Sequence, residues 1–170
     1  MDEIEVKILE VNVKEVQYKL RKLGAKKVFD GTVKAVYLDD GTLGNKKILR
    51  LRKLGDKVQL TYKEHVSRNK FKIDKEHEIY LEDFNEALNH FISLGFVIKK
   101  KTSKHRISYR FKDVSFEIDF INGIPPFLEI ESSKENILNY ASKIGFKRSD
   151  LKPWSGKELY EHYYPKKRKK

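Results

Sequence analysis

The chain of 170 residues contains no cysteine and no long apolar run. The absence of cysteine excludes disulfide bonds, catalysis by a thiolate and zinc sites built on cysteine ligands. No apolar stretch approaches the roughly 18 residues that a membrane-spanning helix needs, so we expect no membrane partner. The start at Met1-Asp2-Glu3 has neither the basic region nor the apolar stretch of a signal peptide. These absences favour a soluble, cytoplasmic protein.

A long linker is also missing. Hydrophobic residues make up 39% of the chain and charged residues 36%, which is typical of a globular protein that is rich in charge. The length suits one domain with a sizeable core, which we predict over residues 1–165. The last five residues, 166–170, are all basic, and we expect them to form a disordered tail.

The charge balance is strongly positive. The formal net charge is +12 at pH 7, from 37 Lys and Arg against 25 Asp and Glu. Subtracting the five positive charges of the tail from +12 leaves +7, so the predicted domain is itself basic. This balance favours an anionic partner, which is either a nucleic acid or a smaller phosphorylated molecule. Composition alone does not choose between them.

Three segments share one pattern, in which a strand with a Glu-x-Glu pair precedes an amphipathic helix and a glycine. The acidic pairs are Glu3 with Glu5, Glu76 with Glu78, and Glu129 with Glu131. Suitable N-cap residues open the three helices at Asn12, Asp83 and Ser133. The glycines that end them are Gly24, Gly95 and Gly145. A weaker helix is predicted from Ser155 to Tyr164.

The remaining segments alternate with period two, which predicts strands. Their expected ranges are 2–9, 33–38, 47–54, 57–65, 71–80, 103–112, 114–121 and 127–132. Turn-forming residues such as Asp40-Gly41 and Asn122-Gly123 separate several of them. This order of elements predicts an α+β domain with a mainly antiparallel sheet.

Ionisable side chains occupy one face of nearly every predicted strand. Glu3, Glu5 and Lys7, for example, alternate with apolar residues. Two arrangements satisfy this pattern. In the first, the charged rows face bulk water and the apolar rows form the core of a sandwich. In the second, the sheet closes into a barrel, the charged rows line its interior and helices cover its apolar outside. A barrel of about eight strands is wide enough to hold a small ligand.

The two signs of charge are segregated by strand, which favours the closed arrangement. Carboxylates dominate at 3–5, 76–78, 117–119 and 129–131, and cations at 50–52, 63 and 104–110. A surface that serves only solubility usually intersperses the signs. The planar guanidinium of Arg holds phosphate oxygens in pairs, and clustered carboxylates are ligands for hard divalent cations such as Mg²⁺. The pattern therefore predicts a site for a polyphosphate and a metal ion.

A series of motifs resembles the CYTH family, the core of the triphosphate tunnel metalloenzyme superfamily. Glu3-Ile4-Glu5-Val6-Lys7 is similar to the family's N-terminal Glu-x-Glu-x-Lys strand. The further matches follow in the family's order and span the chain to residue 131: Leu49-Arg50-Leu51-Arg52, Leu60-Thr61-Tyr62-Lys63, Glu76 with Glu78, Lys104-His105-Arg106, Phe116-Glu117-Ile118-Asp119 and Phe127-Leu128-Glu129-Ile130-Glu131.

This resemblance implies an eight-stranded antiparallel β-barrel that forms a tunnel with a charged interior, with helices packed outside. It also implies hydrolysis or cyclisation of triphosphates with Mg²⁺ or Mn²⁺. The implied metal ligands are Glu3, Glu5, Asp119, Glu129 and Glu131. The implied substrate-binding residues are Lys7, Arg50, Arg52, Lys63, Lys104 and Arg106, and the implied catalytic residues are Glu3, Glu5 and Lys7. Lesser candidates for the metal shell, or for orienting basic side chains, are Glu76, Glu78 and Glu117.

The sequence departs from the family pattern in two places. The usual aromatic-aromatic-Asp-Thr segment reads Val36-Tyr37-Leu38-Asp39-Asp40. Class IV adenylate cyclases, which belong to the family, typically carry a His-Phe pair upstream of the acidic motif, whereas here only Met1-Asp2 precedes Glu3. We therefore predict a metal-dependent triphosphatase that hydrolyses inorganic triphosphate or another triphosphate compound.

Two alternatives stay open. The first is a class IV adenylate cyclase that converts ATP to cyclic AMP and pyrophosphate. The second is a basic module that binds nucleic acid or polyphosphate, although clustered Glu-x-Glu pairs would hinder a nucleic-acid surface. The sequence also leaves open which triphosphate is the natural substrate, and whether the protein is a monomer or a homodimer.

Overall fold

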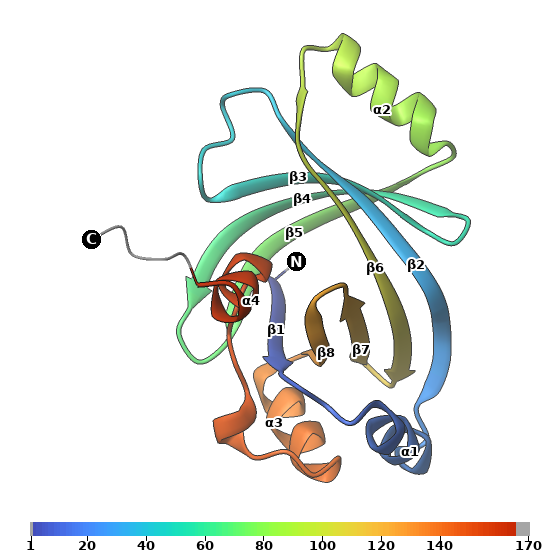
Figure 1. Cartoon of the computed structure of the whole chain (residues 1–170), viewed down its shortest axis with the longest axis vertical. Helices are drawn as coiled ribbons and strands as arrows, with labels where there is room; N and C mark the ends of the chain where they lie inside the picture. Colours follow the sequence, from blue (N-terminus) through green and yellow to red (C-terminus); the bar gives the residue numbers. More distant parts are fainter. Residues whose placement is uncertain (1, 166–170) are drawn as a thin grey trace.

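The computed structural model describes residues 2–165, which form eight strands and four α-helices. The strands are β1 (Asp2–Ile8), β2 (Lys26–Asp39), β3 (Lys47–Leu54), β4 (Lys57–Arg68), β5 (Lys72–Leu81), β6 (Val97–Phe111), β7 (Val114–Ile121) and β8 (Ile124–Glu131). They close into an antiparallel barrel in the order β1-β5-β4-β3-β2-β6-β7-β8. The helices lie outside it (Figure 1). The predicted α+β barrel with external helices is confirmed.

Two strands are longer than predicted. β2 begins at Lys26 and not near residue 33, and β6 begins at Val97 and not near 103. They pair with each other along almost their whole length, with two register irregularities, and form the long arcs of Figure 1. The added segments lack clean alternation in the sequence, so their strand conformation follows from this pairing and not from local pattern.

The main apolar core lies between one end of the barrel and two helices, α1 (Val13–Leu23) and α3 (Lys134–Lys143). Val16 and Leu20 of α1 and Ile137 of α3 are buried against the outward rows of the barrel. Those rows include Val6, Phe116, Ile118, Leu128 and Ile130, each fully buried. The apolar face of this part of the sheet is thus its outer face, and the alternating residues must point inward.

A smaller cluster lies beneath α2 (Phe84–Ser93), at the other end of the molecule from α1 and α3 (Figure 1). Its buried residues Val36, Leu38, Leu51 and Val58 come from β2, β3 and β4. None of the residues of α2 is itself fully buried. The helix therefore covers the sheet as a thin outer layer.

The helix ends follow the signals in the sequence. The side chains of Asn12, Asp83 and Ser133 each accept a hydrogen bond from the backbone N–H three residues later. Gly24, just after α1, has a φ of 90°, the left-handed conformation that glycine adopts without a steric penalty. These predicted caps are confirmed. They fix where each helix begins and so how it meets the barrel.

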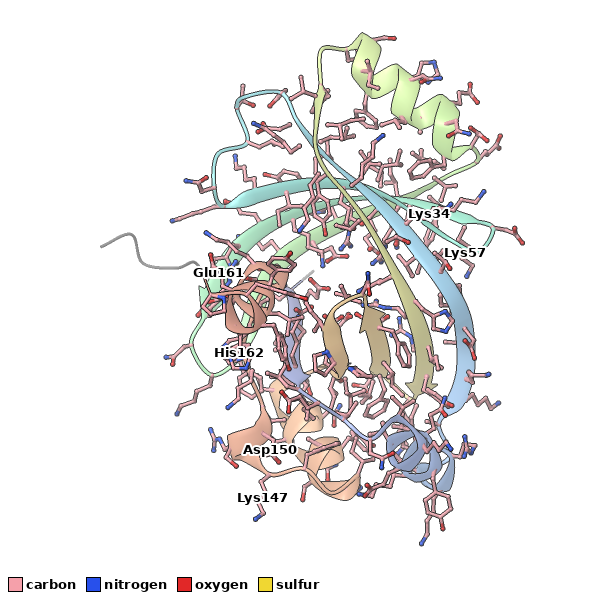
Figure 2. All side chains as sticks on the ribbon, in the orientation of Figure 1. Lys34, Lys57, Lys147, Asp150, Glu161 and His162 are labelled. Carbon is pink, nitrogen blue, oxygen red and sulfur yellow. The ribbon has the colours of Figure 1, made fainter. Side chains whose placement is uncertain are left out.

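The last helix, α4 (Gly156–Tyr163), packs against the barrel through the buried Leu159 and the partly buried Tyr163. The hydroxyl of Tyr163 donates to Glu10 at 3.1 Å, and that of Tyr164 donates to the carbonyl oxygen of Gly123 at 2.7 Å. Figure 2 shows Glu161 and His162 on this helix. Within residues 2–165 no helix is long and apolar enough to cross a bilayer. The predicted basic tail, 166–170, lies outside the described residues.

Candidate functional site: the charged lumen

The strand register places the charged rows inside the barrel. Residues that pair directly across two strands project to the same side of a sheet. Glu3 pairs with Asp74, Glu5 with both Lys72 and Glu131, and Lys7 with Glu129. Further pairs continue the same face around the barrel, namely Lys63 with Glu76, Arg50 with Thr61, Arg52 with Gln59, and Arg106 with Asp119. Lys104 lies two positions from Arg106 on the same strand, so all of the predicted site residues lie on the inner face of the barrel.

Lys7 joins two of the predicted acids. Its Nζ lies 2.7 Å from Oε1 of Glu5 and 2.8 Å from Oε1 of Glu129. Burial opposes the charge of Glu5, but Lys7 and Lys72 outweigh it and lower the pKa of Glu5 to about 2. Burial likewise opposes the charge of Lys7, and the two carboxylates raise its pKa above the usual range. These three groups therefore stay ionised at neutral pH.

Arg106 is the centre of a second ion-pair cluster. Its Nε and Nη2 donate to the two oxygens of Asp119 at 2.6 Å each, and Nη2 also donates to Glu129 at 2.7 Å. Nη1 pairs with Glu117, and Lys104 pairs with Asp119 at 2.5 Å. Asp119 and Glu129, two of the predicted metal ligands, are thus neutralised by cations in this structure.

Glu3 and Glu131 are less well compensated. Lys63 pairs with Glu3 at 2.5 Å and also with Glu76. Burial nevertheless raises the pKa of Glu3 to about 7. Repulsion from Glu5 and Glu76 also raises this pKa, whereas the charge of Lys63 lowers it. Burial also raises the pKa of Glu131 to about 7, with the charge of Glu3 as the next cause. An excess of negative charge therefore lies where β1 meets β8.

Cations crowd the opposite part of the wall, on β3. Arg52 pairs with Glu78 at 3.2 Å and donates to Gln59. Burial, with repulsion from Arg50, lowers the pKa of Arg52 to about 10. The Nε of Arg50 is buried and has no hydrogen-bond partner among residues 2–165. A buried donor without an acceptor is costly, so this part of the lumen is suited to an anion that accepts hydrogen bonds.

The acidic side of the lumen fits a divalent cation by its chemistry. Carboxylate oxygens are the ligands that Mg²⁺ and Mn²⁺ prefer, and the raised pKa values of Glu3 and Glu131 mark crowded, undercompensated carboxyl groups. In the described part of the chain, no three Asp, Glu or His side chains already surround a common point. The donor atoms are present, but several are held by lysine and arginine and must exchange partners to bind a metal.

Lys72, Asp74 and His65 are lumen residues that are absent from the motifs in the sequence. Lys72 and Asp74 lie on β5 in the same row as Glu76 and Glu78, and His65 lies on β4 opposite Asp74. The period-two parity of the predicted strand 71–80 was the signal that could have found Lys72 and Asp74. His105, in contrast, lies on the outer face and pairs with Asp30 at 3.0 Å.

The sequence matches the CYTH domain over residues 1–144, which is most of the chain. This protein belongs to the CYTH family. A protein of Methanocaldococcus jannaschii that is named as a candidate adenylate cyclase is 29% identical over 140 residues, covering 81% of this CYTH chain and 80% of its own.

Two solved structures share the barrel of this CYTH protein. The PH1012 protein of Pyrococcus horikoshii superposes with a TM-score of 0.78 at 31% identity, covering 92% of this chain and 98% of its own. A protein from Hippeastrum, described as a candidate adenylyl cyclase with a dominant triphosphatase activity, superposes with a TM-score of 0.63 at 15% identity. That match covers 94% of this chain and 95% of the Hippeastrum chain, and at this identity it shows the fold alone.

Proposed function

We propose that this CYTH protein hydrolyses a triphosphate compound, of which inorganic triphosphate is the simplest, with a divalent cation as cofactor. The observation that carries the proposal is the separation of charge within one closed lumen. Arg50 and Arg52 crowd one wall, where a buried donor lacks an acceptor. Glu3 and Glu131 crowd another, where burial raises their pKa values. A triphosphate with a bound cation has the complementary charges.

The cations of the lumen are assigned to the phosphates. Arg50 and Arg52 offer planar guanidinium groups that bind phosphate oxygens in pairs. The same role is assigned to Lys7, Lys63, Lys104 and Arg106, each of which holds a carboxylate in this structure. Binding then consists of an exchange of partners, in which phosphate oxygens replace carboxylate oxygens around the same cations.

The carboxylates are assigned to the metal and to the attacking water. Glu3, Glu5 and Glu131, with Asp119 and Glu129, supply oxygen donors for Mg²⁺ or Mn²⁺. When bound, the ion would neutralise phosphate charge and lower the pKa of a coordinated water. A carboxylate of the Glu3–Glu5 pair would orient the attacking water or accept its proton. Water attacks the terminal phosphorus, the P–O anhydride bond breaks, and orthophosphate and diphosphate form.

Cyclisation of ATP is the second candidate, because the M. jannaschii relative carries that name. The two reactions share the phosphate handle but differ in the nucleophile, which for a cyclase is the 3′-hydroxyl of the substrate's own ribose. A triphosphatase needs only water and the three phosphates. The described activity of the Hippeastrum protein supports hydrolysis within this fold.

The test is a product analysis with tripolyphosphate and with ATP, each with Mg²⁺ and with Mn²⁺. We expect orthophosphate from tripolyphosphate and no cyclic AMP from ATP. Glu5→Gln and Glu129→Gln should each abolish metal-dependent phosphate release while the fold persists, and Glu161→Gln on the exposed face of α4 is the matched control. Turnover at the wild-type rate in both lumen variants would refute the site, and cyclic AMP as the main product would replace hydrolysis with cyclisation.

A further inference from the structure

A chain of three polar side chains crosses β4 and β5 and ends at Glu5. The Nδ1 of His65 lies 3.0 Å from Oδ1 of Asp74, and Lys72 Nζ lies 2.6 Å from Oδ2 of the same carboxylate. Lys72 then reaches Oε1 of Glu5 at 3.3 Å. All three side chains belong to the lumen face, because His65 pairs directly with Asp74 and Lys72 pairs directly with Glu5.

Asp74 is held firmly in this chain. Its residue is only 3% exposed, and each of its two oxygens has a different cationic or N–H partner. Burial raises the pKa of such a carboxyl, but Lys72 and His65 outweigh it and the pKa of Asp74 is lowered. A buried carboxylate with both oxygens occupied has little freedom to move. It therefore gives Lys72 a fixed anchor at the wall of the lumen.

The contact of Lys72 with Glu5 is the weaker of its two contacts. It is 0.7 Å longer than the contact with Asp74, since the two distances are 3.3 Å and 2.6 Å. The same Oε1 of Glu5 already accepts from Lys7 at 2.7 Å, so two ammonium groups share one oxygen. Lys7 therefore compensates Glu5 at the shorter distance, and Lys72 is a second cation at that oxygen. An anion that binds Lys72 more tightly than Glu5 does would break the contact between Lys72 and Glu5 at a small cost in free energy.

We propose that Lys72 is a further anion-binding residue of the lumen, and that Asp74 and His65 are positioning residues that hold its ammonium group toward the bound anion. This inference rests on the proposed function for the identity of the anion, a triphosphate. Lys72 exchanges Glu5 for a phosphate oxygen and keeps Asp74. Glu5 is released from one of its two lysines at the same time.

Calorimetric titration of tripolyphosphate in EDTA tests the inference without metal and without turnover. We expect Lys72→Met to weaken binding by about tenfold or more, as for a lost hydrogen bond between charged groups, and Lys72→Arg to retain most of the affinity. Lys75→Met is the matched control, because Lys75 is an exposed residue of the same strand. Lys72→Gln replaces Lys72→Met if that variant fails to fold.

The positioning role of Asp74 and His65 is tested by measuring KM and kcat separately, because a general loss of structure would not change KM alone. We expect Asp74→Asn and His65→Phe to raise KM for tripolyphosphate several-fold with kcat nearly unchanged. His65→Asn should restore KM, because its amide N–H replaces the donor at Nδ1. Equal affinity of the Lys72 and Lys75 variants would overturn the inference, as would no rescue by His65→Asn. Tight binding in EDTA without metal-dependent hydrolysis would refute the proposed function alone. Hydrolysis without binding in EDTA would overturn the inference alone, and absence of both would refute both.

Discussion

At the scale of single residues, the lumen holds two populations of carboxyl groups. Glu5 and Glu129 sit against lysine and arginine, so their pKa values are lowered despite burial. Glu3 and Glu131 are buried with too little positive charge nearby, so their pKa values rise to about 7. Between pH 5 and pH 8 only the second population titrates. Any pH dependence of stability in this window that arises from these four acids therefore reports on Glu3 and Glu131.

The first prediction concerns Glu131. Its pKa is about 7 in the folded protein against an ordinary 4.5, so the folded state binds more protons and stability falls as pH rises through this interval. Above pH 7 the full penalty is present, at most about 3 kcal/mol. Glu131→Gln should therefore raise the Tm in EDTA by several degrees at pH 8 and change it little at pH 5.

Thermal melts at the two pH values measure this difference, with Glu161→Gln as the control on the exposed face of α4. A gain of equal size at pH 5 and pH 8 would contradict the assignment, because a charge-independent effect of the substitution would not depend on protonation. Saturating Mg²⁺ or Mn²⁺ should stabilise the wild-type protein more than the variant.

For single residues, the sequence predicts which side chains point inward but not which partners they contact. Strand parity and the family motifs predicted that Glu3, Lys63, Arg106 and Asp119 point inward, and the register agrees. The choice of partner was not predictable, because it depends on which strands become neighbours around the barrel. Arg106 thus meets Asp119 across the β6–β7 hairpin and Glu129 from the next strand.

At the scale of elements, local signals were sufficient for the helices and insufficient for two strands. Capping residues and apolar stripes are local, so α1, α2, α3 and α4 begin where the sequence predicts. The first half of β2 is a strand because it pairs with the second half of β6, and the start of β6 is a strand because it pairs with the end of β2. More than fifty residues separate the partners in each case. No local pattern contains that information.

The second prediction concerns the cap of α2. Asp83 accepts a hydrogen bond from the N–H of Glu86 at 2.7 Å, and the helix has no fully buried residue to hold it otherwise. Asp83→Ala should cost about 1 kcal/mol of stability, which lowers the Tm by about 2–4 °C in a domain of this size. Glu82→Ala, at the exposed neighbouring position, is the control. An equal decrease in both variants would show that the cap contributes nothing specific.

At the scale of the whole molecule, closure of the sheet turns separate charged strand faces into one site. Parity alone also allowed an open sandwich with its charges in water. Segregation of the two signs and the resemblance to the CYTH family favoured closure, and the barrel confirms it. The alternating pattern does not predict the order of the strands, in which β1 lies between β5 and β8. That order depends on contacts between residues that are distant in the sequence.

The third prediction concerns ligand stabilisation of the whole barrel. A ligand present at 100 times its Kd stabilises the folded state by about 2.7 kcal/mol. Tripolyphosphate at that excess should raise the Tm by about 5–10 °C. The reason is that its negative charges offset the repulsion between Arg50 and Arg52. The double variant Arg50→Ala and Arg52→Ala should lose most of this shift. Sulfate at equal ionic strength controls for general screening of the +12 charge, and an equal shift with sulfate would indicate screening alone.

The pairing of the eight strands decides how a solute can reach the lumen. Each strand has a neighbour on both sides, but not along its whole length: β5 beyond Lys75 pairs only with β4, and β6 before His105 pairs only with β2. The described barrel is therefore closed over part of its length and is an open sheet over the rest. Entry to the lumen is therefore not confined to the barrel axis. Under the proposed function, a polyphosphate would enter through this open part without threading the whole barrel.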